Sequence, residues 1–184
     1  MPRILALSGS LRSGSLNTRL AHALAARAPA GSEVEVITPA GIPLYDGDLE
    51  ESQGIPDAVE EMKARITTSD GLVLVTPEYN QGVPGVMKNV IDWLSRPPAD
   101  IERVFGGLAV AICGATPGRA GTRSAQHALL PTLRALGTQV WSGKTLYISG
   151  ASRVLEEDGS VTDDELDKRM SSFVTGFSRF ASGR

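Results

Sequence analysis

The stretch from Ser8 to Thr18 carries residue types suited to binding an anion. It reads Ser8-Gly9-Ser10-Leu11-Arg12-Ser13-Gly14-Ser15-Leu16-Asn17-Thr18. Small residues allow main-chain N–H groups to converge on one point, and hydroxyl groups add further donors. The stretch leads into an expected helix, whose amino end adds a partial positive charge. We therefore predict a phosphate cradle, with a serine-rich turn that only caps the helix as the alternative.

The residues of this cradle also limit the kind of phosphate. They lack the Gly-Lys-Ser/Thr ending of a nucleotide-hydrolase P-loop, so there is no lysine for a γ-phosphate and no hydroxyl for magnesium. They also lack the G-x-G-x-x-G pattern typical of dinucleotide binding. A monophosphate ester bound without a metal ion fits these residues best.

Two further loops are predicted to end on the same side of the protein. One is Pro77-Glu78-Tyr79-Asn80-Gln81-Gly82, between an apolar run and an amphipathic helix, and the other runs from Gly114 to Gly121. In a parallel sheet of strand order 2-1-3-4-5, both loops and the cradle meet at the topological switch point, where such sheets bind ligands. A ligand with its phosphate on the cradle and a flat ring between the other two loops is flavin mononucleotide (FMN).

The elements that position these loops alternate along the chain. Short apolar and β-branched runs predict five strands at Arg3–Leu7, Val34–Thr38, Leu72–Thr76, Leu108–Cys113 and Gln139–Ile148. Helical spacing predicts helices at Asn17–Arg27, Pro56–Ser69, Pro84–Ser95 and Arg123–Leu136, and a last helix beginning at a capping box of Thr162 and Glu165. Regular alternation predicts a parallel sheet covered by helices on both faces. The connection Pro39–Ile55 is expected to be an ordered loop.

Composition limits the partners and the location. A chain of 184 residues is expected to form one domain over residues 1–184. The net charge of −3, without a run of lysine or arginine, argues against a nucleic-acid partner. No apolar run approaches the length that spans a bilayer, so we expect no membrane association. A single cysteine suits a reducing compartment, and we expect a cytoplasmic protein.

Three motifs together resemble the NAD(P)H-dependent FMN reductase family. They are Ser10-Leu11-Arg12-x-Gly14-Ser15-x-Asn17, Thr76-Pro77-Glu78-Tyr79-Asn80 and Lys88-Asn89-x-Ile91-Asp92-Trp93-Leu94-Ser95-Arg96. The resemblance covers nearly the whole chain, including Ile42-Pro43-Leu44-Tyr45-Asp46. It implies a flavodoxin-like, three-layer α/β fold with a five-stranded parallel sheet. It also implies an enzyme that passes electrons from NADH or NADPH through FMN to a quinone, free FMN, an azo compound or chromate.

The same resemblance implies which residues hold the flavin. The phosphate site comprises Ser10, Arg12, Ser15, Leu16 and Asn17, and the ring site comprises Pro77, Glu78, Tyr79, Asn80 and Gly114. Family members often carry a serine near Gly114, so this chain offers only a main-chain contact there. No protein residue is expected to be catalytic, because the hydride is accepted at the flavin N5.

The resemblance also implies a homodimer or homotetramer. Trp93 and the helix Pro84–Arg96 are the interface candidates. Packing inside one subunit is the alternative for Trp93, because tryptophan is largely buried in either setting. A subunit contact is likewise the alternative role for Tyr79.

Two other functions are weighed against this one. A flavodoxin-type electron carrier would hold FMN and exchange single electrons with a protein partner without being an enzyme. A phosphatase is the more remote alternative, because Cys113 and Arg119 have the spacing of a phosphatase loop with a thiolate nucleophile. Against it, Ala120 stands where such loops carry a hydroxyl residue. His22 and His127 fall in helical stretches away from the three loops, so neither is expected to be a general acid or base.

Overall fold

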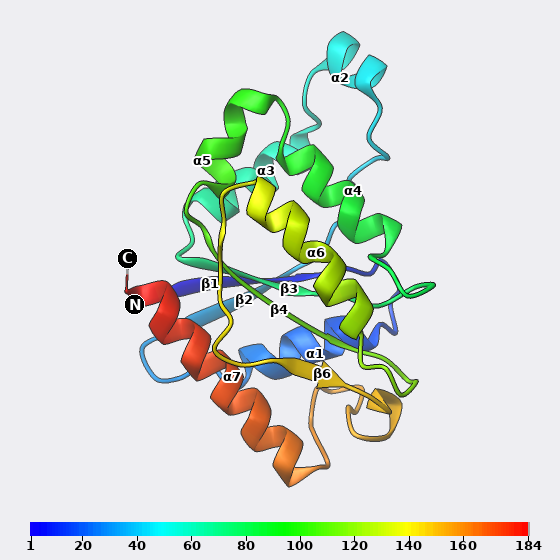
Figure 1. Ribbon diagram of the computed structural model, residues 1–184, viewed down its shortest axis with the longest axis vertical. Helices are drawn as coiled ribbons and strands as arrows, with labels where there is room; N and C mark the ends of the chain where they lie inside the picture. The colour runs from blue at the N-terminus through cyan, green and yellow to red at the C-terminus, as the bar shows by residue number, and fades with distance from the viewer. Residues whose placement is uncertain (184) are drawn as a thin grey trace.

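A computed structural model describes residues 1–183 of the protein (Figure 1). One sheet contains β1 (Arg3–Ser8), β2 (Glu33–Ile37), β3 (Gly71–Val75), β4 (Ala109–Ala115), β5 (Gln139–Val140) and β6 (Leu146–Ile148). The order is β2-β1-β3-β4-β5, β6 also pairs with β4, and every pairing is parallel. The predicted strand order is confirmed, and the fold is flavodoxin-like.

The middle strands are mostly apolar, as expected where both faces of the sheet are covered. In β1, Ile4 and Ala6 face one side, whereas Leu5 and Leu7 face the other, and all four are 0% exposed. Successive side chains of a strand point to opposite faces. One apolar run therefore supplies two separate cores.

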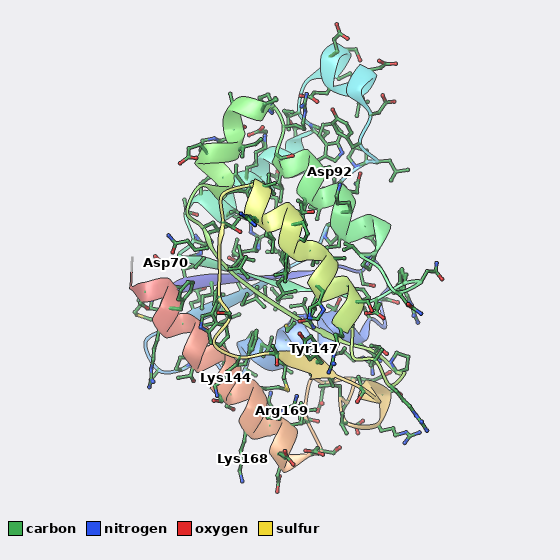
Figure 2. The ribbon with its side chains drawn as sticks, in the orientation of Figure 1. Asp70, Asp92, Lys144, Tyr147, Lys168 and Arg169 are labelled. Carbon is green, nitrogen blue, oxygen red and sulfur yellow. The ribbon has the colours of Figure 1, made fainter. Side chains whose placement is uncertain are left out.

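Helices form the two outer layers of the fold (Figure 1). One face of the sheet packs against α1 (Leu16–Ala25) and α7 (Asp164–Ser182), and the other packs against α3 (Asp57–Thr67), α4 (Gly85–Leu94) and α6 (Arg123–Ala135). This arrangement confirms the predicted three layers. Charged side chains such as Lys168 and Arg169 lie on the exposed side of α7 (Figure 2). Within residues 1–183, no helix combines the length and apolar content that a bilayer crossing requires.

The predicted strand Gln139–Ile148 is wrong as one element, because the chain forms β5 and β6 with a break between them. At the break, the Trp141 ring packs against Phe173 of α7, with ring centroids 5.2 Å apart. A Cβ atom on Gly143 would lie 2.6 Å from Trp141 Nε1, so the chain turns closely around this ring. Packing of one large side chain against α7 thus interrupts the edge of the sheet.

The connection from Pro39 to Ile55 is ordered, as predicted, but it also contains a helix. Helix α2 (Gly47–Gln53) is capped by Asp46, whose Oδ1 accepts a hydrogen bond from the Asp48 N–H at 2.9 Å. It has no buried residue and lies at one end of the molecule (Figure 1). A helix without an apolar stripe escapes prediction from periodicity. The five-residue α5 (Ile101–Phe105) is too short to show a helical period.

The predicted cap of the last helix is wrong. Asp163 caps α7, because its Oδ1 accepts a hydrogen bond from the Leu166 N–H at 2.7 Å. The N–H of Thr162 instead donates to the Val154 carbonyl at 3.2 Å, which holds Thr162 in the preceding connection. A carboxylate also interacts better than a hydroxyl with the positive end of the helix dipole.

Trp93 belongs to the core of its own chain. Its side chain is 0% exposed, and Nε1 donates to the Pro43 carbonyl at 2.9 Å. The Tyr45 ring packs edge-on against it, with ring centroids 5.0 Å apart. Of the two sequence-based alternatives for Trp93, packing inside one subunit is the correct one.

Candidate functional site

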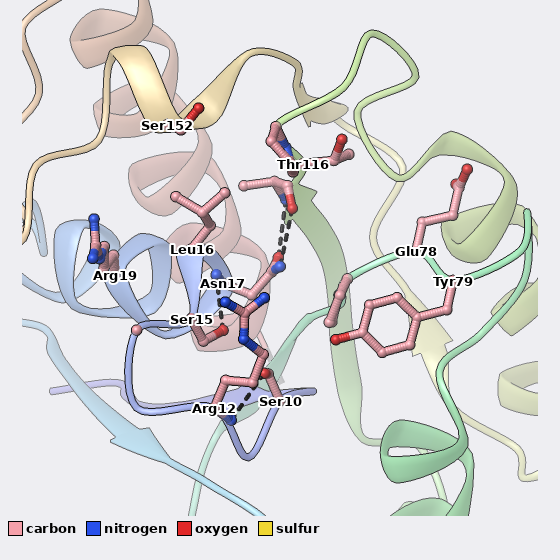
Figure 3. Close-up of a pocket in the computed structure, with 14 residues that line it drawn as sticks. Ser10, Arg12, Ser15, Leu16, Asn17, Arg19, Glu78, Tyr79, Thr116 and Ser152 are labelled. Atoms are coloured by element: carbon pink, nitrogen blue, oxygen red, sulfur yellow. Dashed lines mark hydrogen bonds between the residues drawn. The ribbon is translucent and has the colours of Figure 1, made fainter.

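A hollow of about 340 Å³ opens beside the carboxyl ends of β1, β3 and β4 (Figure 3). Four separate parts of the chain line it: Ser10, Arg12, Gly14, Ser15, Leu16, Asn17, Arg19; Pro77, Glu78, Tyr79; Ala115, Thr116, Pro117; and Ser152. The three predicted loops therefore meet, as expected for the ends of parallel strands in this order.

Hydroxyl and cationic groups gather on one side of the hollow. Ser15 is the N-cap of α1, and its Oγ accepts hydrogen bonds from the N–H groups of Asn17 at 3.2 Å and Thr18 at 3.3 Å. Ser10 Oγ accepts from the Arg12 N–H at 3.3 Å. Because accepting uses only lone pairs, both hydroxyl groups keep a hydrogen to donate to an anion. The Arg12 side chain lies beside both serines (Figure 3).

The side chain of Asn17 is already engaged within the protein. Nδ2 donates to the Ala115 carbonyl at 3.0 Å, and the Ala115 N–H donates to Asn17 Oδ1 at 2.9 Å. The residue is 3% exposed. Asn17 lines the hollow as predicted, but its carboxamide joins α1 to the end of β4.

An aromatic hairpin forms the opposite side of the hollow. Tyr79 and Gly82 exchange main-chain hydrogen bonds around Asn80 and Gln81, whose φ angles are 51° and 58°. Consecutive positive φ angles are typical of the two-residue turns that close hairpins. The Tyr79 ring lies across the hollow from Asn17 (Figure 3). Asn80 occupies the exposed tip of the turn and is outside the residues that line the hollow.

Two predicted ring-site residues have structural contacts of their own. Glu78 Oε2 accepts a hydrogen bond from the Ala125 N–H at 3.1 Å, which ties the hairpin to α6. Gly114 lies inside β4, and a Cβ atom there would be 2.1 Å from the Thr76 carbonyl oxygen and 2.3 Å from Thr122 Oγ1. Glu78 also lines the hollow, whereas Gly114 is buried and is not among the lining residues.

The hollow contains further residues that the predicted site omits. Arg19 is one turn beyond Ser15 on α1, and its side chain forms an ion pair with Glu157 at 3.0 Å. That spacing is a usable signal, because residues four apart share a helix face. Ser152 comes from a short 3₁₀ turn after β6. No sequence pattern connects Ser152 to the cradle. Thr116 and Pro117 belong to the predicted third loop but not to the predicted ligand set.

The phosphatase alternative is inconsistent with the structure. Cys113 is 0% exposed inside β4, and burial raises the pKa of its thiol far above the ordinary value. A phosphatase nucleophile must be an accessible thiolate. His22 and His127 lie in α1 and α6, outside the residues that line the hollow.

The lining fits a flavin monophosphate in its chemistry. Arg12, Arg19 and the serine hydroxyls suit a phosphate at one side, where the amino end of α1 also points. Pro77, Tyr79 and Pro117 offer flat or apolar surfaces at the other side. Cofactor pockets combine polar groups that fix the orientation of the ligand with apolar or aromatic surfaces that cover it.

Comparison with known proteins also points to a flavin-binding protein. Residues 2–153 match the family model described as NADPH-dependent FMN reductase. The chain is 40% identical to an NAD(P)H-dependent FMN reductase of Pseudomonas aeruginosa over 163 residues, which is 89% of this chain and 86% of the relative. It is 37% identical to a quinone reductase of Escherichia coli over 181 residues, covering 97% and 94% of the two chains.

A solved structure agrees with these sequence matches. The flavoenzyme NAD(P)H:(acceptor) oxidoreductase FerB from Paracoccus denitrificans superposes with a TM-score of 0.88 at 34% identity, covering 99% of this chain and 98% of that one. Fold and site define an α/β flavoprotein oxidoreductase. The chain belongs to the NADPH-dependent FMN reductase family.

Proposed function

We propose that this oxidoreductase holds FMN in the hollow at the ends of β1, β3 and β4 and reduces quinones with electrons from NADH or NADPH. The observation that carries the proposal is the meeting of phosphate-type donors and an aromatic hairpin in one hollow. Two relatives named for this activity, a quinone reductase of Escherichia coli and a 2-hydroxy-1,4-benzoquinone reductase of a Burkholderia species, are 37% and 34% identical to this chain. When bound, FMN supplies the hydride-accepting chemistry.

The protein residues then have binding and orienting roles. We assign the phosphate to Ser10, Arg12, Ser15, Leu16 and Asn17, and the ring to Pro77, Glu78, Tyr79, Asn80 and Gly114. The Arg12 guanidinium neutralises charge on the phosphate, and the hydroxyl of Ser15 donates a hydrogen bond that orients it. The Tyr79 hairpin shields the ring from water on one side. Asn80 and Gly114 contribute by shaping the hairpin and the end of β4.

The test combines flavin binding with turnover. We expect FMN to bind the purified protein, and NADPH to bleach the flavin absorbance at about 450 nm until a quinone restores it. Arg12→Ala should weaken FMN binding about 10- to 100-fold, because it removes a charge-assisted hydrogen bond. Arg134→Ala is the matched control, since Arg134 is an exposed arginine far along α6. Equal FMN affinity in both variants contradicts the role of Arg12.

The electron-carrier alternative makes a different prediction in the same experiment. A carrier would hold FMN but consume no NADH or NADPH when a quinone is added. Membership of a reductase family favours the enzyme. Continuous consumption of NADPH in the presence of a quinone supports it, and a flavin that stays oxidised contradicts it. Free FMN, azo compounds and chromate are further acceptors to compare.

We also propose a cytoplasmic protein in which residues 1–184 form one flavodoxin-like domain and two or four copies assemble. A single, buried cysteine suits a reducing compartment. The exposed side chains of Leu44 and Tyr45, 81% and 38% exposed, support an interface next to α4. Light scattering on the purified protein gives the number of subunits. A monomer at micromolar concentration contradicts this part of the proposal.

A further inference from the structure

We propose that Asn17 is a positioning residue that joins the phosphate side of the hollow to its ring side, and that it does not bind the phosphate through its side chain. The inference deepens the proposed function and rests on it. Asn17 follows the N-cap Ser15 by two positions, so its main chain belongs to the phosphate side. Its side chain reaches across to the end of β4 (Figure 3).

Both polar atoms of the Asn17 carboxamide are engaged by one residue. The donor and the acceptor pair with the carbonyl and the N–H of Ala115, at 3.0 and 2.9 Å. Asn17 and Ala115 are 3% and 2% exposed. Turning the carboxamide toward a phosphate would leave two buried main-chain groups without partners, which is costly. The bridge is therefore expected to persist when a ligand is bound.

Ala115 needs this bridge because its neighbouring strand has ended. The register of β3 and β4 ends at Val75 and Cys113, after which the Thr76 N–H donates once more to the Cys113 carbonyl at 2.9 Å. The chain then leaves the sheet at Pro77 to form the hairpin. The Asn17 carboxamide takes the place of the missing strand partner. It supplies one donor and one acceptor, as a strand would.

The bridge fixes the start of the third loop. Thr116 and Pro117 follow Ala115 directly and line the hollow. On its other side, the Thr116 N–H donates to the Ile148 carbonyl of β6 at 2.9 Å. Asn17 thus holds the β4 end at a set distance from the cradle. The width of the space for the flavin ring therefore depends on Asn17, whose main chain belongs to the phosphate side of the hollow.

Riboflavin, which lacks the phosphate, separates this role from direct phosphate binding. We expect Asn17→Ala to weaken riboflavin and FMN binding by the same factor, roughly tenfold, because the ring side loosens in both complexes. Arg12→Ala, as the control, should weaken FMN binding and leave riboflavin binding unchanged. A loss confined to FMN in Asn17→Ala, or no loss at all, overturns the inference. If the wild-type protein binds neither flavin, the proposed function fails instead.

A second variant and a flavin-free measurement guard against simple misfolding. Asn17→Asp keeps the acceptor for the Ala115 N–H but sets a carboxylate oxygen against the Ala115 carbonyl, so riboflavin binding should again fall. Without flavin, hydrogen exchange at the Ala115 amide should accelerate in Asn17→Ala. Exchange at the Gly9 amide, which donates to Val75 at 2.9 Å, should stay slow if the sheet is intact. Unchanged exchange at Ala115 together with unchanged riboflavin binding contradicts the positioning role.

Discussion

The Glu78 carboxylate accepts a hydrogen bond from the Ala125 main-chain N–H, with 3.1 Å between Oε2 and N. Ala125 lies in the first turn of α6, where the side chain of the N-cap residue Thr122 accepts no hydrogen bond from the main-chain N–H groups of the helix. Glu78 therefore caps this helix from a loop 47 positions earlier in the chain. A negative charge at the amino end of a helix is also favourable. The contact holds the aromatic hairpin against α6.

Replacing Glu78 tests this capping role. Glu78→Ala is expected to lower the free energy of unfolding by about 0.5–2 kcal/mol, the usual cost of losing an N-cap. Glu78→Gln keeps an acceptor oxygen and should lose less. Urea denaturation of the flavin-free proteins measures both. Equal stability of the alanine and glutamine variants contradicts a role for the hydrogen bond.

Gly114 is expected to tolerate no side chain. The added methyl group of Gly114→Ala would lie 2.1 Å from the Thr76 carbonyl oxygen, so β3 and β4 must separate. We expect a loss of about 3 kcal/mol, at the upper end for overpacking, together with weaker flavin binding. Gly85→Ala is the matched control, because at that first-turn position of α4 a Cβ atom would have no atom within 4 Å beyond its chain neighbours and the backbone of its own helix. Thermal unfolding of both variants makes the comparison.

The hairpin turn can be stabilised. Gln81 has a φ of 58°, a left-handed conformation that costs a residue with a side chain about 1–2 kcal/mol. Gln81→Gly relieves this strain and creates Asn-Gly, the preferred pair for such turns, so the melting temperature should rise. Gln81→Ala keeps the strain and serves as the control. If the melting temperature rises equally in the alanine and glycine variants, relief of backbone strain is not the cause.

Acid should weaken the contacts around Asp100. Hydrogen bonds from Arg103 and from the buried Lys63 lower the pKa of Asp100 from 3.8 to about 2. Because the folded-state pKa is lowered, the stabilisation is fully present above about 4 and is lost as the pH falls toward 2. Asp100→Asn should be less stable than wild type near neutral pH, and the two stabilities should converge toward pH 2. Parallel stability curves in urea titrations at several pH values contradict this assignment.

The sequence predicts the central layers well because burial on both faces leaves a strong signal. The apolar runs of β1, β3 and β4 and the amphipathic helices beside them follow directly from the residues. The cradle is also readable, since Ser10, Arg12 and Ser15 are neighbours in the chain. The break at Trp141 cannot be predicted from the sequence, because it depends on packing against α7. The polar helix α2 cannot be predicted either, because it lacks an apolar stripe.

The partners of site residues are the least predictable part. Asn17 lines the hollow, but its side chain bonds to Ala115, 98 positions away. Ser152 reaches the hollow only because β6 pairs beside the end of β4. Such contacts form only in the folded sheet, so they cannot be predicted from the local sequence.

The interior position of Cys113 has a chemical consequence for a protein of this family. Quinones are electrophiles that alkylate exposed thiolates, and relatives of this chain are named for reducing them. The chain has one cysteine, and its sulfur is enclosed between the sheet and the helices that cover it. Such reagents are therefore not expected to inactivate the protein by alkylating this cysteine, because a buried thiol is inert.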